Sequence, residues 1–265
     1  MVDHLIDKQR VAESFSRAAP TYDRVADLQR SVGEHLLSLL PNETSPTAMD
    51  LGCGTGYFTP ALQSASRCTT LVNLDLAMGM LQYARNHRPA KNALWVCADA
   101  ESLPLADESL DLIFSSLAIQ WCENLPQLFN EVARTLSPGG SFVFATLGPN
   151  TLAELRTAWQ AADNYVHVNR FLSEASIRQA IPETLHLQQL HEENRILKYN
   201  ELRELTDELK GIGAHNMNSG QHVGLTGRKK IRRFMQAYEE QRDAQGQLPA
   251  TYQVYYGILT KHSHN

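Results

Sequence analysis

The stretch Met49-Asp50-Leu51-Gly52-Cys53-Gly54-Thr55-Gly56 decides the fold class of this 265-residue chain. An acidic residue ends a short apolar run, three alternating glycines follow, and a helix-like segment begins near Tyr57. Because glycine has no Cβ, a ligand can approach the backbone of such a turn closely. A glycine turn between a strand and a helix also presents free N–H groups and the positive end of the helix. The stretch therefore predicts a loop that binds a small-molecule cofactor, and a nucleoside fits it best.

The spacing of the glycines narrows the class of nucleoside. A dinucleotide fingerprint has the order G-x-G-x-x-G, whereas here the third glycine arrives one residue early, at Gly56, and Tyr57 takes the fingerprint position. Asp50 would repel a pyrophosphate and attract a cationic ligand. These features argue against a nicotinamide-dependent oxidoreductase. An acid followed by three alternating glycines resembles motif I of the class I methyltransferases, whose cofactor S-adenosylmethionine carries an ammonium and a sulfonium.

The composition excludes several other classes. Apolar residues make up 43% of the chain, and 24 Lys and Arg against 29 Asp and Glu give a net charge of −5, which does not favour nucleic acid. We expect no membrane span, since no apolar run approaches the ~18 residues that one needs, and no signal peptide. The four cysteines show no C-x-x-C spacing. We therefore expect reduced thiols in a cytoplasmic protein, with no metal and no disulfide.

Strand-like and helix-like segments alternate from residue 47 to residue 146. Short apolar runs predict buried parallel strands, and the amphipathic runs between them predict helices. Two later runs predict an antiparallel pair that closes the sheet. The fold class is therefore α/β, a Rossmann-like, mostly parallel sheet of seven strands with helices on both faces. The expected strands are residues 47–51, 69–74, 93–97, 109–116, 141–146, 184–197 and 251–261, and the expected helices of this part are residues 57–65, 76–86, 125–136, 152–162, 173–180, 201–209 and 226–244.

The chain divides into four parts on this reading. Residues 1–40 predict a helical lid, with one helix over 3–17, a break at Ala18-Ala19-Pro20, and a second helix over 22–40 that Thr21 would cap. Phe15 and Tyr22 of this lid would cover the cofactor, unless the two helices are only a cap on the core. The other parts are a cofactor-binding core over 41–150, substrate-binding insertions with the sixth strand over 151–249, and the seventh strand over 250–265.

Two acids follow the second and third strands. Asp75 lies 19 residues beyond Gly56, where an acid can bind a ribose diol. The alternative is that Asp75 caps the next helix, and we favour ribose binding because the loop and the acid occur together at matching spacing. Asp99 follows the third strand and could accept from an adenine amino group, although a simple turn would also explain it.

More specific motifs are distributed along nearly the whole chain. The stretches 117–122 (Leu-Ala-Ile-Gln-Trp-Cys), 209–214 (Leu-Lys-Gly-Ile-Gly-Ala) and 224–227 (Gly-Leu-Thr-Gly) are the most informative, since the glycine loop is common to all class I methyltransferases. On these motifs the chain resembles the malonyl-acyl-carrier-protein O-methyltransferases of biotin synthesis (BioC). The remaining motifs occupy residues 7–9, 15–19, 22–23, 28–29, 50–58, 99–104, 138–140, 146–147, 151–155, 167–171 and 248–252.

The resemblance implies a reaction and its partners. A methyl group would pass from S-adenosylmethionine, leaving S-adenosylhomocysteine, to the free carboxylate of a malonyl thioester held by acyl-carrier protein or coenzyme A. The ester would mask a charge, so that fatty-acid enzymes can elongate the chain toward the pimeloyl unit of biotin. A carboxylate with a pKa near 4 is ionised at pH 7, so we expect no general base. We expect a monomer.

The resemblance also implies site residues. For the substrate carboxylate the candidates are Tyr22, His167, Asn169 and Arg170, with Phe171 as an apolar wall. Alternatively, Tyr22 only covers the cofactor, His167 and Asn169 are turn residues, and Arg170 faces outward. The expected cofactor-binding residues are Gln9, Phe15, Tyr22, Asp50, Gly52, Cys53, Gly54, Gly56, Asp75, Leu76, Met80, Asp99, Ala100, Ser115 and Leu117.

A basic run stands out in this net-acidic chain. Five cations occur within six residues, at Arg228, Lys229, Lys230, Arg232 and Arg233. Such runs are usually solvated faces. Because carrier proteins are strongly acidic and a local basic patch can steer such a partner, we expect this helix to bind the carrier protein.

Three rival functions remain in view. A methyltransferase acting on another acid, on carbon or on a hydroxyl would share the core but lack the stretches at 209–227. An N-methyltransferase of planar nitrogens often has Asn/Asp-Pro-Pro-Tyr after the fourth strand, where this chain has Ser115-Ser116-Leu117-Ala118. A non-catalytic protein that binds S-adenosylmethionine is the third rival, which only a turnover assay separates.

Overall fold

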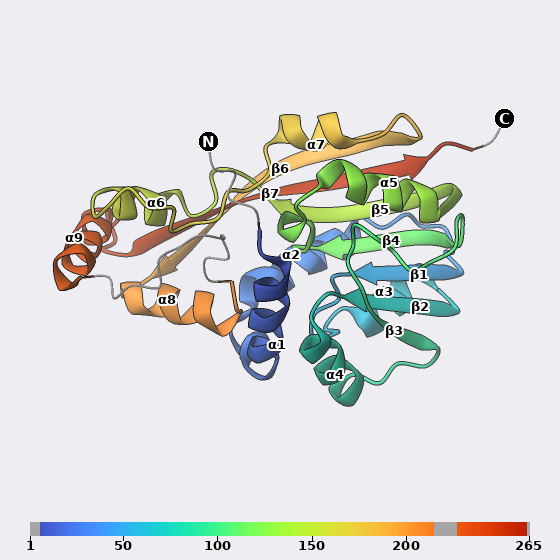
Figure 1. The fold of residues 1–265 in the computed structure, drawn as a ribbon, viewed down its shortest axis with the longest axis horizontal. Helices are drawn as coiled ribbons and strands as arrows, with labels where there is room; N and C mark the ends of the chain where they lie inside the picture. The colour runs from blue at the N-terminus through green and yellow to red at the C-terminus, as the bar shows by residue number, and fades with distance from the viewer. Residues whose placement is uncertain (1–5, 215–226, 264–265) are drawn as a thin grey trace.

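The computed structural model describes residues 6–214 and 227–263, and its centre is one seven-stranded sheet (Figure 1). The strand order is β3-β2-β1-β4-β5-β7-β6, with β7 antiparallel to both of its neighbours and the first five strands parallel. The predicted α/β fold with an antiparallel closing pair is confirmed. The strands are β1 (Thr47–Leu51), β2 (Thr70–Asp75), β3 (Ala93–Cys97), β4 (Leu110–Ser116), β5 (Leu136–Leu147), β6 (Leu185–Tyr199) and β7 (Leu248–Lys261).

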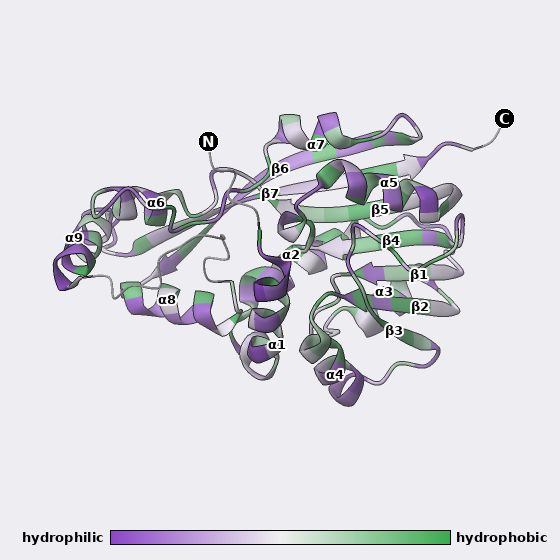
Figure 2. Cartoon of the chain, in the orientation of Figure 1, coloured by the Kyte–Doolittle hydropathy of each residue, from purple (hydrophilic) through white to green (hydrophobic). Residues whose placement is uncertain are grey.

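Helices cover both faces of the sheet, which is why its central strands are apolar on both sides (Figure 2). On one face Val32 and Leu62 pack with Phe114 of β4. On the other face Phe129 and Ile177 pack with Ile113, the preceding residue of the same strand. The helices are α1 (Lys8–Val25), α2 (Asp27–Ser38), α3 (Thr59–Ser66), α4 (Met78–His87), a short 3₁₀ turn η1 (Ile119–Trp121), α5 (Leu125–Thr135), α6 (Ala153–Gln160), α7 (Glu174–Ala180), α8 (Leu202–Gly211) and α9 (Arg228–Glu239).

The predicted break at Pro20 is wrong, because α1 continues through Pro20 and ends only before Ala26. Proline in a helix removes one backbone hydrogen bond, yet Pro20 lies on the exposed side, while Ala18 and Ala19 before it are buried. Thr21 is not an N-cap either. Its hydroxyl donates to the Ala18 carbonyl (3.0 Å) and to the Gly211 carbonyl (3.1 Å). Tertiary packing of the alanine face therefore outweighs the local preference for a break.

Two strands begin earlier than the sequence predicts. β5 starts at Leu136, which pairs with Leu110 before a bulge that contains the expected turn and its Gly139 at φ 80°. β7 starts at Leu248 although Pro249 follows. At Pro249 the strand pairs with β6 alone, since β5 joins only from Val254 onward, and proline is tolerated where one side of a strand makes no ladder bonds.

The strands β6 and β7 extend past the other five as a two-stranded ribbon that carries α6, α8 and α9 (Figure 1). Tyr199 at the end of β6 pairs with Leu248 at the start of β7. Helix α6 packs on α9, and α8 packs on α1, so the ribbon brings a helical lobe to the carboxyl ends of the parallel strands. In the described ranges, no helix combines the length and the apolar character that crossing a membrane requires.

Candidate active site

The glycine loop leaves β1 by a backbone path that needs positive φ. Gly52 (φ 78°) and Gly54 (φ 54°) both lie in the left-handed region that side chains disfavour. The N–H groups of Gly52 and Cys53 donate to the Leu74 carbonyl (2.8 and 3.0 Å), and the Gly54 N–H donates to Asp75 Oδ2 (2.8 Å). The loop is thereby tied to the end of β2, and a cavity opens beside it.

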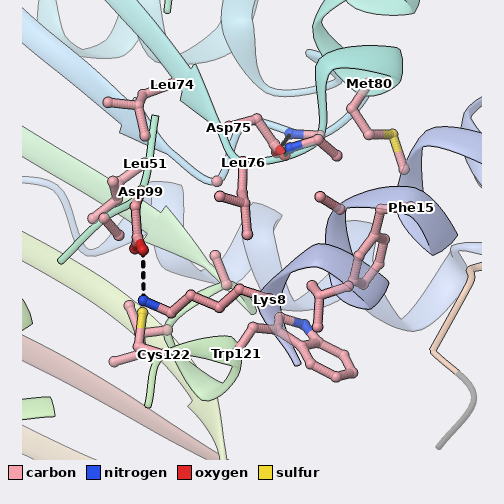
Figure 3. Close-up of a pocket in the computed structure, with 18 of the residues that line it drawn as sticks. Lys8, Phe15, Leu51, Leu74, Asp75, Leu76, Met80, Asp99, Trp121 and Cys122 are labelled. Atoms are coloured by element: carbon pink, nitrogen blue, oxygen red, sulfur yellow. Dashed lines mark hydrogen bonds and ion pairs between the residues drawn. The ribbon is translucent and has the colours of Figure 1, made fainter. Parts of the chain in front are cut away.

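This cavity, the inner pocket, lies at the carboxyl ends of β1, β2 and β4, where open α/β sheets bind ligands (Figure 3). The structure brings ten of the fifteen expected cofactor-binding residues together in its wall. They are Phe15, Tyr22, Gly52, Gly54, Asp75, Leu76, Met80, Asp99, Ala100 and Leu117.

The other five expected residues do not line the inner pocket. Gln9 is exposed and donates to Glu13 Oε1 (3.1 Å). Ser115 is buried between strands, where its hydroxyl donates to the Leu51 carbonyl (2.8 Å). Cys53, Gly56 and Asp50 lie in or under the glycine loop.

Asp75 is held by backbone donors on both of its oxygens. Gly54 N–H donates to Oδ2 and Ala77 N–H donates to Oδ1, each at 2.8 Å. Burial raises the pKa of Asp75, and these hydrogen bonds oppose that rise. The contact with Ala77 is not the helix cap that the sequence offered as the alternative, because Ala77 is itself the N-cap of α4 and that helix has no side-chain cap. This contact fixes the carboxylate at the pocket wall without excluding a ligand.

Asp50 is the least satisfied acid of the site. It is 2% exposed, and its Oδ2 has no hydrogen-bond partner among the described residues. Burial, and then the nearby Asp75 carboxylate, raises the pKa of Asp50 to about 8. A buried carboxylate with no partner is costly. A ligand ammonium would satisfy it, so the donor set fits a cationic nucleoside such as S-adenosylmethionine.

Lys8 is a site residue that the sequence reasoning missed. Its Nζ contacts Asp99 Oδ2 at 2.6 Å and Glu101 Oε1 at 2.9 Å, so the start of α1 is joined to the segment after β3 (Figure 3). The sequence did contain a signal for this residue. Lys8, Val11 and Phe15 are spaced so that they share one face of a helix, and all three line the pocket.

A second cavity, the outer pocket, adjoins the inner pocket. Both are lined by Phe15, Tyr22, Leu117 and Trp121, and the outer pocket adds the expected Asn169 and Phe171. No charged side chain occurs among the described residues that line it. Its polar side chains are Tyr22, Gln29, Gln120, Thr151, Asn169 and Tyr252.

Gln29 is the second residue that the sequence reasoning missed, although it was part of a motif. Its Oε1 is buried without a hydrogen-bond partner in the described part of the chain. Gln120, by contrast, donates to the Leu117 carbonyl (2.6 Å) and its Oε1 accepts from Thr146 Oγ1 (3.3 Å). This unsatisfied oxygen is an acceptor, so Gln29 would meet a carboxylate through its Nε2 donors and not through Oε1.

His167 and Arg170 do not line the outer pocket. Both line a separate polar pocket, together with Arg156, Trp159 and Asp163. The His167 ring stacks on Trp159 with centroids 3.7 Å apart, and its Nε2 lies 2.8 Å from Asp163 Oδ1. Arg170 is exposed.

The basic run forms the first half of α9, at the far end of the ribbon (Figure 2). Lys230 is partly buried, with its Nζ 3.4 Å from Asp163 Oδ2 and over the Tyr165 ring. The other four cations, Arg228, Lys229, Arg232 and Arg233, are exposed. No group of three or more His, Cys, Asp or Glu that could hold a metal occurs within residues 6–214 and 227–263.

Comparison with known proteins agrees with this geometry. Residues 49–144 match the family model described as a methyltransferase domain. The YcgJ protein of Bacillus subtilis has the same fold, with a TM-score of 0.61 at 17% identity, over 89% of this chain and 99% of that one.

Relatives by sequence are more specific. The biotin biosynthesis bifunctional protein BioHC of Cellvibrio japonicus is 52% identical over 97% of this chain, although the chain spans only 51% of that protein's length. The malonyl-[acyl-carrier protein] O-methyltransferase of Hahella chejuensis is 42% identical over 94% of this chain and 89% of its own length. The family resemblance found in the motifs is confirmed, and the chain belongs to the malonyl-[acyl-carrier protein] O-methyltransferase family.

Proposed function

We propose that this chain transfers a methyl group from S-adenosylmethionine to the free carboxylate of malonyl-acyl-carrier protein, in biotin synthesis. The observation that carries the proposal is the junction of the two pockets. An outer pocket with neutral polar side chains shares a wall with an inner pocket that suits a cationic nucleoside. The family to which the chain belongs supports malonyl as the acid.

The cofactor roles follow from the inner pocket and from Asp50, which lies beneath the glycine loop that borders it. When bound, S-adenosylmethionine supplies a methyl group that its positive sulfur already activates. Asp50 would bind the ammonium, Asp75 the ribose and Asp99 the adenine amino group. Phe15 and Tyr22 would cover the cofactor, so that residues 1–40 act as a lid and Lys8 fastens it to Asp99.

The reaction requires no general base from the protein. The malonyl carboxylate is ionised at neutral pH, so these side chains need only align it and exclude water. Alignment of that kind can supply ~7–11 kcal/mol of the barrier reduction. Phe171 and Trp121 would provide the dry wall of the outer pocket.

We assign the substrate carboxylate to the neutral donors Tyr22, Gln29 and Asn169. A guanidinium would hold the carboxylate firmly but reduce its nucleophilicity, whereas a phenol or an amide donates without full charge. Burial, then the Asp75 and Asp23 carboxylates, raises the pKa of Tyr22 well above its usual value. Its phenol therefore stays protonated and remains a donor at neutral pH.

Gln29→Glu tests this assignment, because it changes one amide into a carboxylate of the same shape. We expect KM for the malonyl substrate to rise at least about tenfold through like-charge repulsion, with little change in S-adenosylmethionine affinity. Gln127→Glu, at an exposed position of α5, is the matched control. An unchanged KM in Gln29→Glu would remove Gln29 from the substrate site.

Intact-mass analysis tests the proposed function itself. Malonyl-carrier protein incubated with the enzyme and S-adenosylmethionine should gain the mass of one methyl group. Acetyl-carrier protein, which has no free carboxylate, should gain none. If the chain binds the cofactor but methylates neither, a non-catalytic protein or another acid substrate becomes the better account.

Helix α9 is the proposed contact for the carrier protein. Its basic residues Arg228, Lys229 and Lys230 occupy the first turn, where the positive end of the helix disfavours cations by ~0.3–1 kcal/mol each. A solvated face gains nothing from that placement, whereas an acidic partner would benefit from it. Ile231, 41% exposed, adds an apolar contact in the same patch.

Charge reversal at Arg228, Lys229 and Arg232 to Glu should raise KM for malonyl-carrier protein at least about tenfold at low salt. The helix itself should survive, since Glu in the first turn is favourable. KM for a small malonyl thioester should stay unchanged. The control reverses three exposed arginines elsewhere, Arg85, Arg178 and Arg203, and an equal effect in that control would show that only net charge matters.

A further inference from the structure

We propose that the polar pocket beside α6 binds the phosphate of the carrier protein's phosphopantetheine arm, with Arg156 and Arg170 as its ligands. The inference rests on the proposed function, because a carrier-protein thioester carries this phosphodiester between the protein and the acyl group. It assigns an interaction to two residues that line neither the inner nor the outer pocket.

Four neighbouring cavities lie in series from α9 to the inner pocket. The polar pocket shares His167 and Val168 with a connecting pocket, which also includes Lys210 and Thr206. The connecting pocket shares Leu152, Asn169, Phe171, Leu209 and Ala214 with the outer pocket. The outer pocket in turn shares four lining residues with the inner one. We infer that an extended acyl arm entering near α9 follows this series of cavities toward the methyl donor.

The loop from His167 to Phe171 separates the two kinds of environment along this path. Arg170 lines the polar pocket, whereas Asn169 and Phe171 line the outer pocket. The arm needs an anion contact near its protein end and a neutral, dry environment near its acyl end. The loop provides both within a few residues.

The charges of the polar pocket favour an anion. Its one acid, Asp163, is already engaged, since His167 Nε2 lies 2.8 Å and Lys230 Nζ 3.4 Å from its oxygens. Burial alone would raise the pKa of Asp163, but the hydrogen bonds from His167 and the Tyr165 N–H outweigh it and lower that pKa. Arg156 and Arg170 line the same pocket and supply its uncompensated positive charge, and the planar guanidinium is a side chain that suits phosphate oxygens.

The pocket also lies beside the proposed carrier contact. Lys230 of α9 reaches Asp163 in its wall, and Phe234 of α9 stacks on Trp159 with centroids 4.0 Å apart. A carrier protein on the exposed face of α9 would place the root of its arm next to this wall.

The test compares phosphopantetheine with pantetheine, its analogue without the phosphate. Equilibrium titration of the ligand-free chain should show tighter binding of phosphopantetheine than of pantetheine. Arg170→Gln should weaken the binding of phosphopantetheine about tenfold, so that this difference disappears. Arg170→Lys should restore part of it. Arg170 is preferred to Arg156 for the substitution, because Arg156 also donates to the Pro149 carbonyl (2.6 Å) and would disturb the fold.

Kinetics with the malonyl thioesters of the two compounds give the second readout. Arg170→Gln should raise KM for malonyl-phosphopantetheine about tenfold and leave KM for malonyl-pantetheine unchanged. Arg203→Gln, at an exposed position of α8, is the control. Equal effects on both thioesters, or no effect on either, would overturn the phosphate site. Selective binding of phosphopantetheine without methylation of either thioester would instead support the site and overturn the proposed substrate.

Discussion

Asp50→Asn is expected to weaken S-adenosylmethionine binding at least about 30-fold, since removing one partner of a buried charge pair costs ~2–5 kcal/mol. In the same variant the ligand-free protein should become more stable at pH 8. Both effects have one cause. Asp50 is buried with an unpartnered oxygen, so its charge is unfavourable until a ligand cation arrives.

The raised pKa of Asp50 determines how stability and cofactor affinity change with pH. The pKa of Asp50 is raised from 3.8 to about 8 in the folded chain. The folded protein therefore holds a proton that the unfolded chain has lost, and the stability from this group falls as pH rises from about 4 through about 8. Binding of the cofactor ammonium needs the ionised carboxylate, so affinity should rise by up to about tenfold per pH unit between pH 6 and pH 8.

Calorimetric titration of the cofactor at several pH values would check the predicted affinity. Thermal melts of the ligand-free protein would check the predicted stability. The parent chain should show the pH-dependent affinity and Asp50→Asn should not. Asp207→Asn, at an exposed position of α8, should behave as the parent. If Asp50→Asn binds the cofactor normally, the ammonium is held elsewhere.

Gly52→Ala is expected to destabilise the fold by ~3 kcal/mol, whereas Gly54→Ala should cost only ~1 kcal/mol. Both glycines have positive φ, but a Cβ on Gly52 would lie 2.2 Å from Ala118 Cβ, and one on Gly54 meets nothing within 4 Å. The difference in stability between the two variants therefore measures the cost of the steric clash between the glycine loop and Ala118, which precedes η1. Gly54→Ala should still lose cofactor binding, because its methyl group would project into the inner pocket.

Denaturant unfolding of the two variants, alongside cofactor titration, measures these effects. The double variant Gly52→Ala with Ala118→Gly should regain much of the lost stability, since only the backbone strain remains. The single variant Ala118→Gly provides the other corner of the cycle. A double variant no more stable than Gly52→Ala alone would contradict the proposed clash.

The centre of the sheet was predictable from sequence because its central strands are buried on both faces. Runs such as residues 47–51 and 110–116 have the length and apolar content of a central strand, whereas β3 lies at the edge and is only partly buried. Asp75 and Asp99 mark where the second and third strands end. The start of β7 was harder to predict. Pro249 suggests the end of a strand, and only the pairing of that residue with β6 alone shows why the strand tolerates a proline.

The lid shows where local rules fail. Proline and its flanking alanines predict a break, yet the alanine face packs well enough to keep α1 continuous through Pro20. Lys8 was missed for a different reason. The predicted helix over 3–17 already placed Lys8 and Phe15 on one face, but the sequence does not show that this face meets Asp99. Gln9, its neighbour in the same motif, points to Glu13 instead.

The substrate residues were only partly predictable. The motif at residues 167–171 indicates that this loop takes part in the function, but it does not show which of its side chains lines which cavity. Asn169 and Phe171 line the outer pocket, and His167 and Arg170 line another. Gln29 lies far from this loop in sequence, and its unpartnered amide oxygen becomes visible only once the chain is folded.

The pairing of Tyr199 with Leu248 makes residues 200–247 equivalent to the loop of a hairpin. The segment leaves and re-enters the molecule at adjacent points, so its length is nearly decoupled from the register of the ribbon, and doubling such a loop costs only ~0.6 kcal/mol in closure entropy. The segment also packs Leu205, Phe234 and Tyr238 into the core with Tyr252 of β7, so a replacement must supply an equivalent apolar face. The ribbon tip is therefore a natural grafting point, at which one ancestral methyl-transferring core could acquire different recognition modules without rebuilding its sheet.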